Sequence, residues 1–595
     1  MKFLGYLAGI IVGLVVILYV VAFTPFGNAL VAPVIESKIQ QQTKMQSKLD
    51  TFVLSMSHFE ILLHINKDNA ISLKGKYSLF SQTFDIDYKV AMANLATLEP
   101  LTKQPLRGDF FTNGNLKGDM DFITINGDSN FAKSDTKYHV ELTKFNPTSI
   151  IAHIKDMKLQ KVLYTVSQSQ YAKADVDIDI NFKNITIHKL DGDIKLITKK
   201  GMLDSALMKR DFNITLPQTA FSMNLDAKLK KDDLTYSYLL NSNLAKITTS
   251  GDIVTSPLKT DIKYGVDIKE LLVLKPLSKV DIKGTMKLNG TLKGTKDNMI
   301  NKLYMSGDLD NRYLTKVYKF ESLMPKFHYA LSMLNKIKTT HIDTAMKLRT
   351  SLANLDVKKA TLKLSDNSFV SDYTTQVPSL EKLYFITQRH MRGGIVANGE
   401  IKKAKDLDFS AHSNIAGGKL DAKLHNDDFH ADINSMQTLD ILHILIYPEI
   451  FKSTLDAKID YNIVAQKGKA KGYLNNGLFT KNQVFTLVKQ YTKLNMYKER
   501  FKGDVDADIN KENIIASLNL TSNTSSIKTK NTHLNTKTNK IKSNIDIVAN
   551  NNPIGVRLKG DVNAPDVKID ANELIKKEAT KAIQKEAGKF LKGLF

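Results

Sequence analysis

The sequence predicts a mainly β protein: an elongated, repetitive, curled antiparallel sheet (a β-groove) with an N-terminal transmembrane helix, a few short helices and a C-terminal amphipathic helix. Three observations lead to this fold class. The N-terminus holds a long uncharged apolar segment, apolar and polar residues alternate strictly over much of the chain, and a motif of 24 residues recurs along it. Alternation with a period of two is typical of half-buried strands.

The beginning of the chain predicts a membrane anchor over residues 1–27. No charged residue occurs between Lys2 and Glu36, and the apolar run Phe3–Phe23 has 21 residues. A helix of that length spans about 31 Å, close to the thickness of a hydrocarbon core. Cleavable signal peptides have shorter apolar regions, about 7–15 residues, and Pro33 would obstruct cleavage at the one plausible site. We therefore expect an uncleaved single span, with the body on the side away from Lys2.

Three glycines in this segment form two overlapping G-x-x-x-G steps, at Gly5, Gly9 and Gly13. Small residues at this spacing create a flat stripe on which another membrane helix can pack. They are candidate helix-packing residues, although glycine is common in membrane spans. A connecting helix is expected next, over residues 28–50.

Alternation dominates residues 51–570, which we interpret as a repetitive sheet of roughly 30–40 strands. In Phe221–Lys230 every odd position is apolar and every even one polar, and Asp175–Phe182, Leu455–Tyr461 and Gly503–Ile509 follow the same rule. Each such strand has one apolar and one charged face. The candidate residues for lining an apolar groove are Val176, Ile178, Ile180, Met223, Leu225, Ala227, Ile459 and Val505. Polar turns are expected at 230–233 and 425–428.

The recurring motif is the strongest sign of internal organisation. Leu95–Gly118 and Leu271–Gly294 share the pattern L-x-x-L-[EK]-P-L-[ST]-K-x-x-[LI]-[RK]-G-x5-G-x-L-K-G without a gap, and Leu380–Lys403 keeps the spacing but loses the proline. We expect one helical turn or loop in each copy, followed by alternating strands with glycines at bends. Fainter echoes begin near residues 159, 331 and 439. Repeats of this kind predict an elongated array.

Residues 571–595 predict a different element. Apolar residues recur there at intervals of three and four, while six lysines cover much of the remaining surface. Such a basic amphipathic helix can lie on an anionic membrane or cap the end of a sheet, and the sequence leaves both open.

Composition and charge weigh against several functional classes. The formal charge is +23, but only 8 of the 84 basic residues are Arg, and the lysines alternate with Asp and Asn along strand-like stretches. This pattern is typical of a solvated face, so we expect no nucleic-acid partner. There are no cysteines, which excludes disulfides and thiolate chemistry but does not identify the compartment.

Recognisable catalytic chemistry is absent from the sequence. There is no H-E-x-x-H, G-x-S-x-G, P-loop or dinucleotide motif, so we expect no enzyme, no cofactor and no metal. The best metal candidate is the cluster His425, Asp427, Asp428, His430 and Asp432. Its intervening apolar residues indicate a hairpin with these polar groups on its tip and outer face.

In layout the whole chain resembles the AsmA-like family, which includes TamB-related proteins. The points of resemblance are the N-terminal span, the helix after it, the long series of alternating strands, and an L-x-G-x-x-x-x-P-x-[VI] segment before the terminal helix. That segment is Leu558–Val567 here. A Thr-Gly pair usual after the first helix is replaced by Ser55-Met-Ser-His-Phe59.

The resemblance implies a function. Members of the family are anchored in the inner membrane of Gram-negative bacteria, have a periplasmic body, and are implicated in phospholipid transport and outer-membrane homeostasis. They are similar to bridge-like lipid-transfer proteins, which hold acyl chains in an apolar β-groove. The implied partners are phospholipid, the inner membrane, and an outer-membrane protein or membrane helix. The alternative is an envelope assembly scaffold whose sheet docks an outer-membrane partner by strand addition.

Overall fold

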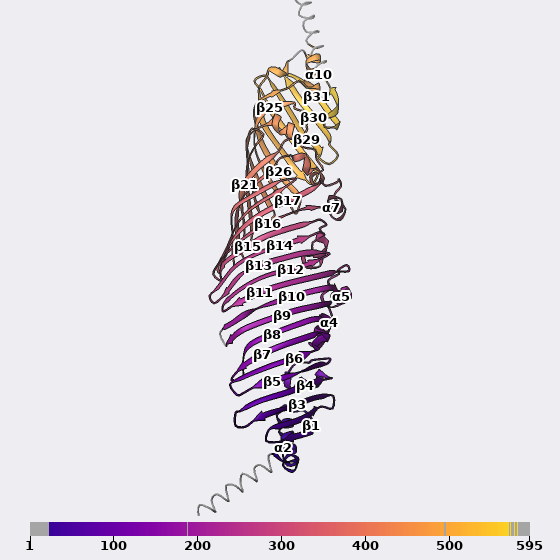
Figure 1. Ribbon diagram of the computed structural model, residues 1–595. Helices are drawn as coiled ribbons and strands as arrows, with labels where there is room; N and C mark the ends of the chain where they lie inside the picture. The colour runs from indigo at the N-terminus through magenta and orange to yellow at the C-terminus, as the bar shows by residue number, and fades with distance from the viewer. Residues whose placement is uncertain are drawn as a thin grey trace, which may run out of the picture. The chain divides into compact units, whose positions relative to one another are not determined.

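The computed structural model describes residues 23–186, 189–492 and 495–570, together with Asn572, Lys576 and Thr580 (Figure 1). Most of the anchor expected over residues 1–27 lies outside the described residues, which include only its last five positions, 23–27. Gly5, Gly9 and Gly13 fall in the part that is not described, and so does nearly all of the helix expected over 571–595. In the described part of the chain, no helix is both long and apolar enough to cross a membrane.

The fold is mainly β. The described residues form one sheet of 32 strands, joined mostly by tight turns and a few short helices, and every strand pairing given below is antiparallel. The sheet is not strongly curled, which differs from the curled sheet that the sequence led us to expect. A pattern of alternation fixes which residues share a face, but curvature depends on twist and bulges that it does not encode.

The chain divides into two compact units, and the first is Met1–Met299. Its helical elements are α2 (Pro25–Thr43), η1 (Leu95–Leu98), α3 (Glu99–Thr102), η2 (Phe131–Lys133), α4 (Leu159–Thr165), α5 (Ser205–Phe212), η3 (Leu271–Leu274) and α6 (Lys275–Ser278). Its strands are β1 (Ser47–Leu54), β2 (His58–Ile65), β3 (Asn69–Ser78), β4 (Thr83–Met92), β5 (Phe110–Gly118), β6 (Phe122–Ser129), β7 (Asp135–Thr143), β8 (Asn146–Lys158), β9 (Ala172–Thr186), β10 (Lys189–Leu203), β11 (Ala220–Lys230), β12 (Asp233–Ser242), β13 (Ala245–Thr255), β14 (Leu258–Ile268) and β15 (Met286–Thr295).

The second unit is Ile300–Phe595. Its helical elements are α7 (Asn311–Val317), η4 (Leu380–Leu383), α8 (Tyr384–Thr387), α9 (Thr438–Ile444), α10 (Gln483–Thr492) and η5 (Met496–Lys498). Its strands are β16 (Asn298–Leu309), β17 (Phe327–Lys338), β18 (His341–Thr350), β19 (Asn354–Lys363), β20 (Phe369–Val377), β21 (Ile395–Lys403), β22 (Leu407–Ile415), β23 (Gly418–His425), β24 (Asp428–Gln437), β25 (Phe451–Asn462), β26 (Lys467–Phe479), β27 (Phe501–Asn510), β28 (Asn513–Thr521), β29 (Ser525–Asn535), β30 (Lys540–Ala549), β31 (Asn552–Asp561) and β32 (Ala564–Asp570).

Helix α2 covers the open edge of β1. Asn28 donates from Nδ2 to the Leu54 carbonyl (3.0 Å), Gln40 donates from Nε2 to the Ser47 carbonyl (3.1 Å), and Glu36 Oε2 accepts from the backbone N–H of Leu49 (3.0 Å). Side chains of α2 thus take the place of a neighbouring strand, which removes a site for unwanted strand pairing. The connecting helix was expected over 28–50. It starts earlier, at Pro25, and it ends at Thr43, where Lys44 adopts a left-handed backbone conformation.

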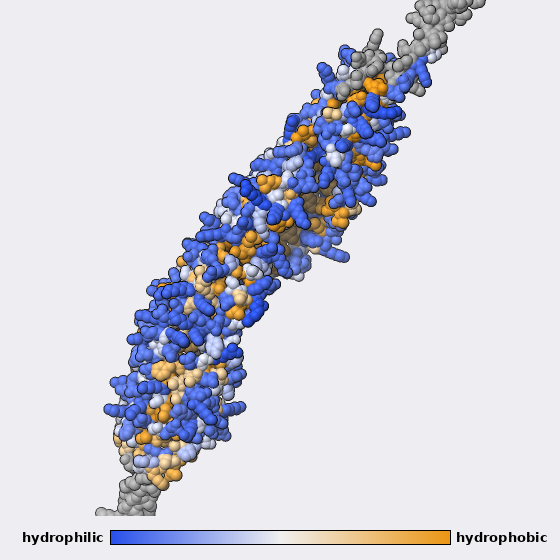
Figure 2. Space-filling view, turned by 90° about the vertical axis from the view of Figure 1, so that its right-hand side faces the viewer, coloured by the Kyte–Doolittle hydropathy of each residue, from blue (hydrophilic) through white to orange (hydrophobic). Residues whose placement is uncertain are grey.

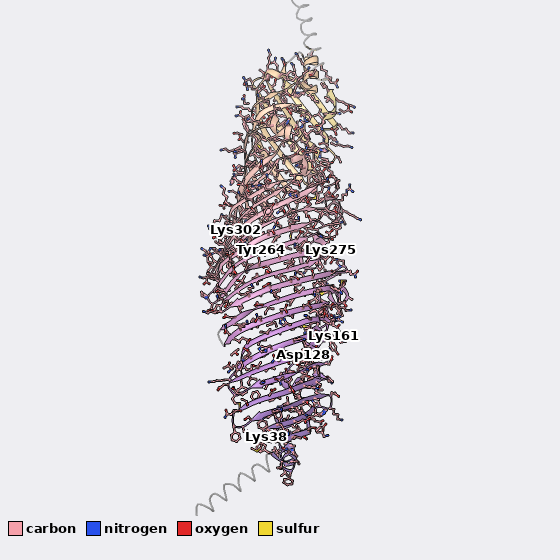
Figure 3. The ribbon with its side chains drawn as sticks, viewed as in Figure 1. Lys38, Asp128, Lys161, Tyr264, Lys275 and Lys302 are labelled. Atoms are coloured by element: carbon pink, nitrogen blue, oxygen red, sulfur yellow. The ribbon has the colours of Figure 1, made fainter. Side chains whose placement is uncertain are left out.

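Short helices of the first unit gather at one edge of the sheet. Four strands follow α2, four follow the η1 and α3 turn, two follow α4, and four follow α5. Because each of these numbers is even and the strands are antiparallel, the chain is back at the same edge of the sheet when the next of these helices begins. Figure 1 shows α4 and α5 at that edge, and in Figure 3 Lys161 of α4 and Lys275 of α6 lie there too. The opposite edge is made of hairpin turns. We call the two the helix edge and the hairpin edge.

The three copies of the sequence motif have one local structure. Each begins with a 3-10 turn and continues as one turn of α-helix, at Leu95, Leu271 and Leu380. The first backbone N–H of each copy donates to the carbonyl thirteen residues later, at Gly108, Gly284 and Gly393, over 2.8–2.9 Å. The expected helical turn is confirmed. The echo at 331 was wrong, because Leu331 lies within β17, whereas α4 and α9 cover the echoes near 159 and 439.

Candidate apolar binding face

In the first unit, the strand register aligns apolar residues on one face of the sheet. Directly opposed residues of an antiparallel pair share a face. Leu225 of β11 lies opposite Leu196 of β10 and Tyr238 of β12. One unbroken row of such partners, with one residue from each strand β2–β15, consists of Ile61, Leu73, Tyr88, Gly114, Gly127, Tyr138, Ala152, Ile180, Ile194, Ala227, Tyr236, Gly251, Ile262 and Leu292.

The second unit has a comparable face. Leu331, Met333 and Ile337 of β17 lie opposite apolar residues of β18. From β21 to β32 another row is apolar apart from the hydroxyl group of Tyr461. It consists of Ile401, Phe409, Leu424, Phe429, Tyr461, Gly468, Ile509, Ile514, Leu534, Ile541, Gly560 and Pro565. Each unit therefore carries its own apolar face across consecutive strands.

The residues singled out from sequence meet in the first unit. Through β10, Val176, Ile178 and Ile180 of β9 are aligned with Met223, Leu225 and Ala227 of β11, each in its own row. Five of these six side chains are half-buried in the described structure. In the second unit, Ile459 and Val505 are also half-buried and lie two strands apart.

Val176 differs from the others because protein covers it. It is only 4% exposed and packs with Ala132 of η2, Met157 and Ala174, beside Leu159 and Val162 of α4. Elements of the helix edge thus fold over the margin of the face. Ile178 is partly exposed but packs against this cluster, and Ile180 is the more open position of β9.

The opposite face is charged, as the alternation predicted. Lys158 pairs with Asp175 (2.6 Å), Lys199 with Asp177 (2.5 Å), and Lys293 with Asp261 (2.6 Å). The backbone N–H of Asp156 and the Lys199 ammonium lower the pKa of Asp177. Figure 2, which looks onto the side that carries α4 and α5, shows mostly hydrophilic residues with hydrophobic patches among them. Exposed pairs of this kind contribute little stability, so this face mainly solubilises the sheet.

Aromatic rings fill the spaces left by glycines on the apolar face, a feature that the sequence reasoning missed. Tyr88, Tyr264 and Tyr373 each lie opposite a glycine of the following strand, at Gly114, Gly290 and Gly399. An added Cβ at Gly290 would approach the Tyr264 ring to 2.3 Å, so only glycine admits the ring there. Each tyrosine precedes its copy of the motif by seven residues and its glycine by 26, and this shared spacing is the signal that could have revealed the pairs.

Polar atoms within the face of the first unit bond to one another. The hydroxyls of Tyr88 and Tyr138 lie 2.6 Å apart, Thr112 Oγ1 lies 2.6 Å from the Tyr138 hydroxyl, and Thr112 donates to the Asp128 carbonyl (2.8 Å). Burial and the bond to Tyr138 raise the pKa of Tyr88 well above its ordinary value. Since these groups are satisfied, they interrupt the apolar surface far less than bare hydroxyls would.

Near the end of the second unit, α10 and η5 cover the face. Phe485 and Val488 of α10 and Met496 of η5 pack on strands β25–β31 in one core, with side chains of β32 at its margin. Val488 of α10 and Ile547 of β30 are each 1% exposed. Here the apolar residues have a protein partner, so this region is a closed core.

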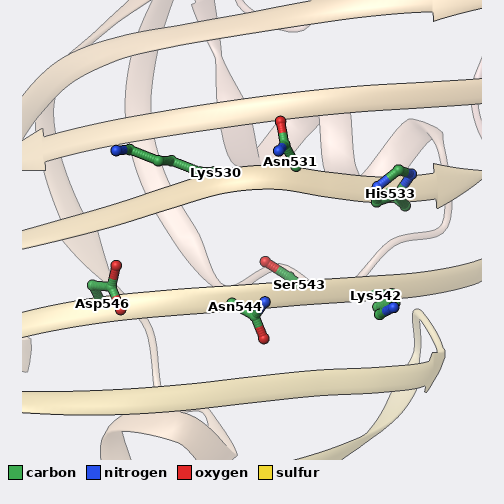
Figure 4. A pocket seen from close by; sticks show the side chains of 7 residues that line it. All are labelled: Lys530, Asn531, His533, Lys542, Ser543, Asn544 and Asp546. Carbon is green, nitrogen blue, oxygen red and sulfur yellow. The ribbon is translucent and has the colours of Figure 1, made fainter.

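A polar depression on the outer surface of β29 and β30 is a weaker candidate. Figure 4 shows its lining residues, which are Lys530, Asn531, His533, Lys542, Ser543, Asn544 and Asp546. It lies at the β-bulge between Lys530 and His533, where the register shifts. With two lysines and one carboxylate on an open surface, it lacks the enclosure of a specific ligand site.

The histidine and aspartate cluster forms the expected hairpin, and its two histidines contact different carboxylates. His425 Nδ1 lies 2.8 Å from Asp408, while His430 contacts Asp460 (2.7 Å) and Asp432 (3.2 Å). Within residues that the structure describes, no group of three or more side chains is arranged to hold a metal ion. The turns expected at 230–233 and 425–428 are confirmed.

Comparisons with known proteins add no assignment. No protein-family model matches the chain, and no curated protein matches it at a significant level.

Proposed function

We propose that this chain is a phospholipid-transport protein of the Gram-negative envelope, anchored in the inner membrane, whose periplasmic sheet holds acyl chains on its apolar face. In this proposal acyl chains lie along the apolar face of the sheet, and head groups project into water. The protein acts in outer-membrane homeostasis and catalyses no reaction.

The observation that carries the proposal is the unbroken apolar row across β2–β15, whose members other than Ala152 remain partly exposed. Half-exposed side chains on a single sheet layer leave apolar area in contact with water, at about 25 cal/mol per Å². Acyl chains laid along the rows would cover that area and would meet apolar groups at every strand. A row that continues from strand to strand suits a ligand that moves along the sheet, because no strand then forces the methylenes into water.

The resemblance to the AsmA-like family agrees with this reading and supplies its setting: the inner membrane, the periplasm and phospholipid as cargo. The hairpin that carries the L-x-G-x-x-x-x-P-x-[VI] segment pairs Leu558 with Val567 and Gly560 with Pro565, and it ends the strands of the sheet.

A specific observation favours the scaffold alternative. Among the described residues β32 is paired with β31 on one side only, whereas α2 covers the open edge of β1. An open terminal strand can accept a strand from a partner protein. On this alternative the apolar face would be structural and the β32 edge would be the working surface.

Photo-crosslinking of the full chain in native membranes tests the proposal. Crosslinkers at Met223, Leu225 and Ala227 should label phospholipid, because these side chains lie on the apolar face. Matched crosslinkers at Asn224 and Lys228, which are exposed on the opposite face of the same strand, should not. Equal labelling from both faces, or labelling from neither, would contradict a lipid-binding face and favour the scaffold.

A further inference from the structure

The hairpin edge of the first eight strands presents large apolar side chains to water. The four turns that join β1 to β2, β3 to β4, β5 to β6 and β7 to β8 carry Met56, Phe80, Met120 and Phe145, all of them exposed, and Phe80 is 97% exposed. A later turn at the same edge holds Lys231 and Asp232. Turn residues are normally polar, so four successive apolar tips require an explanation.

The N-terminal end of α2 lies at this same edge. Asn28 bonds to Leu54, the last residue before the Met56 turn, while Gln40 bonds to Ser47 at the other end of β1. Helix α2 therefore starts at the hairpin edge and runs toward the helix edge. The apolar segment of the sequence ends at Phe23, two residues before the helix. The point where the expected anchor leaves the bilayer is thus beside the Met56 turn.

A second apolar surface lies at this corner. Phe26, Leu30 and Val34 of α2 are all exposed, and their spacing of four residues places them on one side of the helix. Gly27 and Asn28, by contrast, are buried. The first turn is also held by β3, since the backbone N–H of Tyr77 donates to the Ser57 carbonyl (2.9 Å). The corner is a fixed surface with apolar groups on both elements.

The charges at the tips are mixed. Asp119 Oδ1 accepts from the backbone N–H groups of Asp121 and Phe122 (2.8 and 2.7 Å), which shapes the Met120 turn, and Lys144 precedes Phe145. These two turns therefore carry charges of both signs, so contact with a bilayer would not depend on anionic lipid. Its apolar tips suit the boundary between head groups and acyl chains.

We propose that the hairpin edge of β1–β8 lies along the surface of the lipid bilayer, with Met56, Phe80, Met120 and Phe145 inserted at the interface. This rests on the membrane-anchoring part of the proposed function and is independent of what the apolar face binds. Successive tips are two strands apart, or about 10 Å, so the four span about 29 Å. A body standing upright on its anchor would bring only the first of them within the 5–10 Å depth of the interface.

Fluorescence quenching in vesicles tests this geometry. The chain has no cysteines, so single substitutions Met56→Cys, Phe80→Cys, Met120→Cys and Phe145→Cys can each carry an environment-sensitive fluorophore. The full chain is reconstituted into phosphatidylcholine vesicles that contain a lipid with a quencher near its head group. We expect quenching at all four positions and none at Lys231→Cys, the matched position on a polar turn of the same edge.

Two outcomes would overturn the proposal. A reference position in the expected anchor shows whether the anchoring part of the proposed function fails as well. Quenching at Met56→Cys alone would show an upright body, and quenching at none of the four would show no contact. Ile17→Cys, in the expected anchor, should be quenched by a lipid labelled deep in its acyl chain. If Ile17→Cys is quenched and the tips are not, only the edge contact fails. If Ile17→Cys is not quenched either, the anchoring part of the proposed function fails too.

Discussion

The apolar face is open on β10–β14 and closed on β25–β31, although both regions follow the same sequence rule. Strands in both alternate apolar and polar residues in antiparallel register. Leu225 in the first region stays half-buried, whereas Ile547 in the second is 1% exposed, since α10 and η5 pack on it. Alternation therefore fixes the face of a residue, and a separate element decides whether that face can accept a ligand.

The largest expected loss of stability comes from placing a charge in helix α10, which covers the closed region. Val488→Asp would place a carboxylate without a partner in a core that excludes water, which should destabilise the packing of α10 by at least about 4 kcal/mol. We expect increased binding of a hydrophobic dye and rapid proteolysis between β26 and β27. Lys489→Asp, the exposed neighbouring position, is the matched control and should change neither. Unchanged protection in Val488→Asp would mean that α10 is not a cover.

A smaller difference is expected from truncating one side chain in each region. Ile547→Ala should cost about 2–5 kcal/mol, because it leaves a cavity in a filled core. Leu225→Ala should cost less than about 1.5 kcal/mol, because that side chain is only partly buried in the folded protein. Hydrogen exchange of β30 and β11, followed peptide by peptide, measures the two effects separately. Equal losses would contradict the distinction between an open and a closed face.

The smallest effect concerns the charged face, which both regions share. The hydrogen bond from His430 to Asp460, with Asp432 nearby, raises the pKa of His430 above its ordinary value of 6.5. A raised pKa contributes stability that is fully present below about pH 6.5 and is lost as pH rises through the folded-state pKa. The contribution should be under about 1 kcal/mol because the pair is exposed.

Titration of His430 by hydrogen exchange at its ring carbon, read by mass spectrometry, checks this prediction. Asp460→Asn should move the pKa of His430 down toward 6.5. Asp408→Asn, which removes the partner of His425 on β22, is the control and should leave His430 unchanged. An unaltered pKa of His430 in Asp460→Asn would show that the pair does not form.

Much of the fold follows from sequence alone. Period-two alternation correctly placed apolar and polar residues on opposite faces of β11, and the shared motif predicted a helical turn or loop where helical turns begin at Leu95, Leu271 and Leu380. These features depend on residues close together in the chain, which is why a pattern can reveal them. The echo at Leu331 failed because a pattern of two leucines is also compatible with a strand.

The rest depends on contacts between distant segments. Val176 looks like Ile178 and Ile180 in sequence, yet it is buried because Ala132 and α4 arrive from elsewhere. In the same way, the residues of β30 around Ile547 do not indicate that α10 packs on this side chain. Such contacts leave no periodic signal, so the sequence predicted the candidate site as a face and could not tell its open part from its closed part.

The most direct test of the central claim is to break the open face at one strand. Leu225→Asp combined with Ala227→Asp would place two carboxylates in adjacent rows of β11. A phospholipid passing them would have to expose methylenes, at about 0.8 kcal/mol each, which slows passage by orders of magnitude. Asp226→Lys, on the opposite face of the same strand, is the matched control.

The readout is envelope permeability in a strain that depends on this protein, with protein level measured in parallel and a lipid crosslinker at Ile178 as a second probe. We predict that the double variant accumulates normally, still labels lipid from Ile178, and fails to maintain the permeability barrier, while Asp226→Lys behaves as the unchanged protein. A double variant that accumulates and supports a sound envelope would contradict lipid passage along this face.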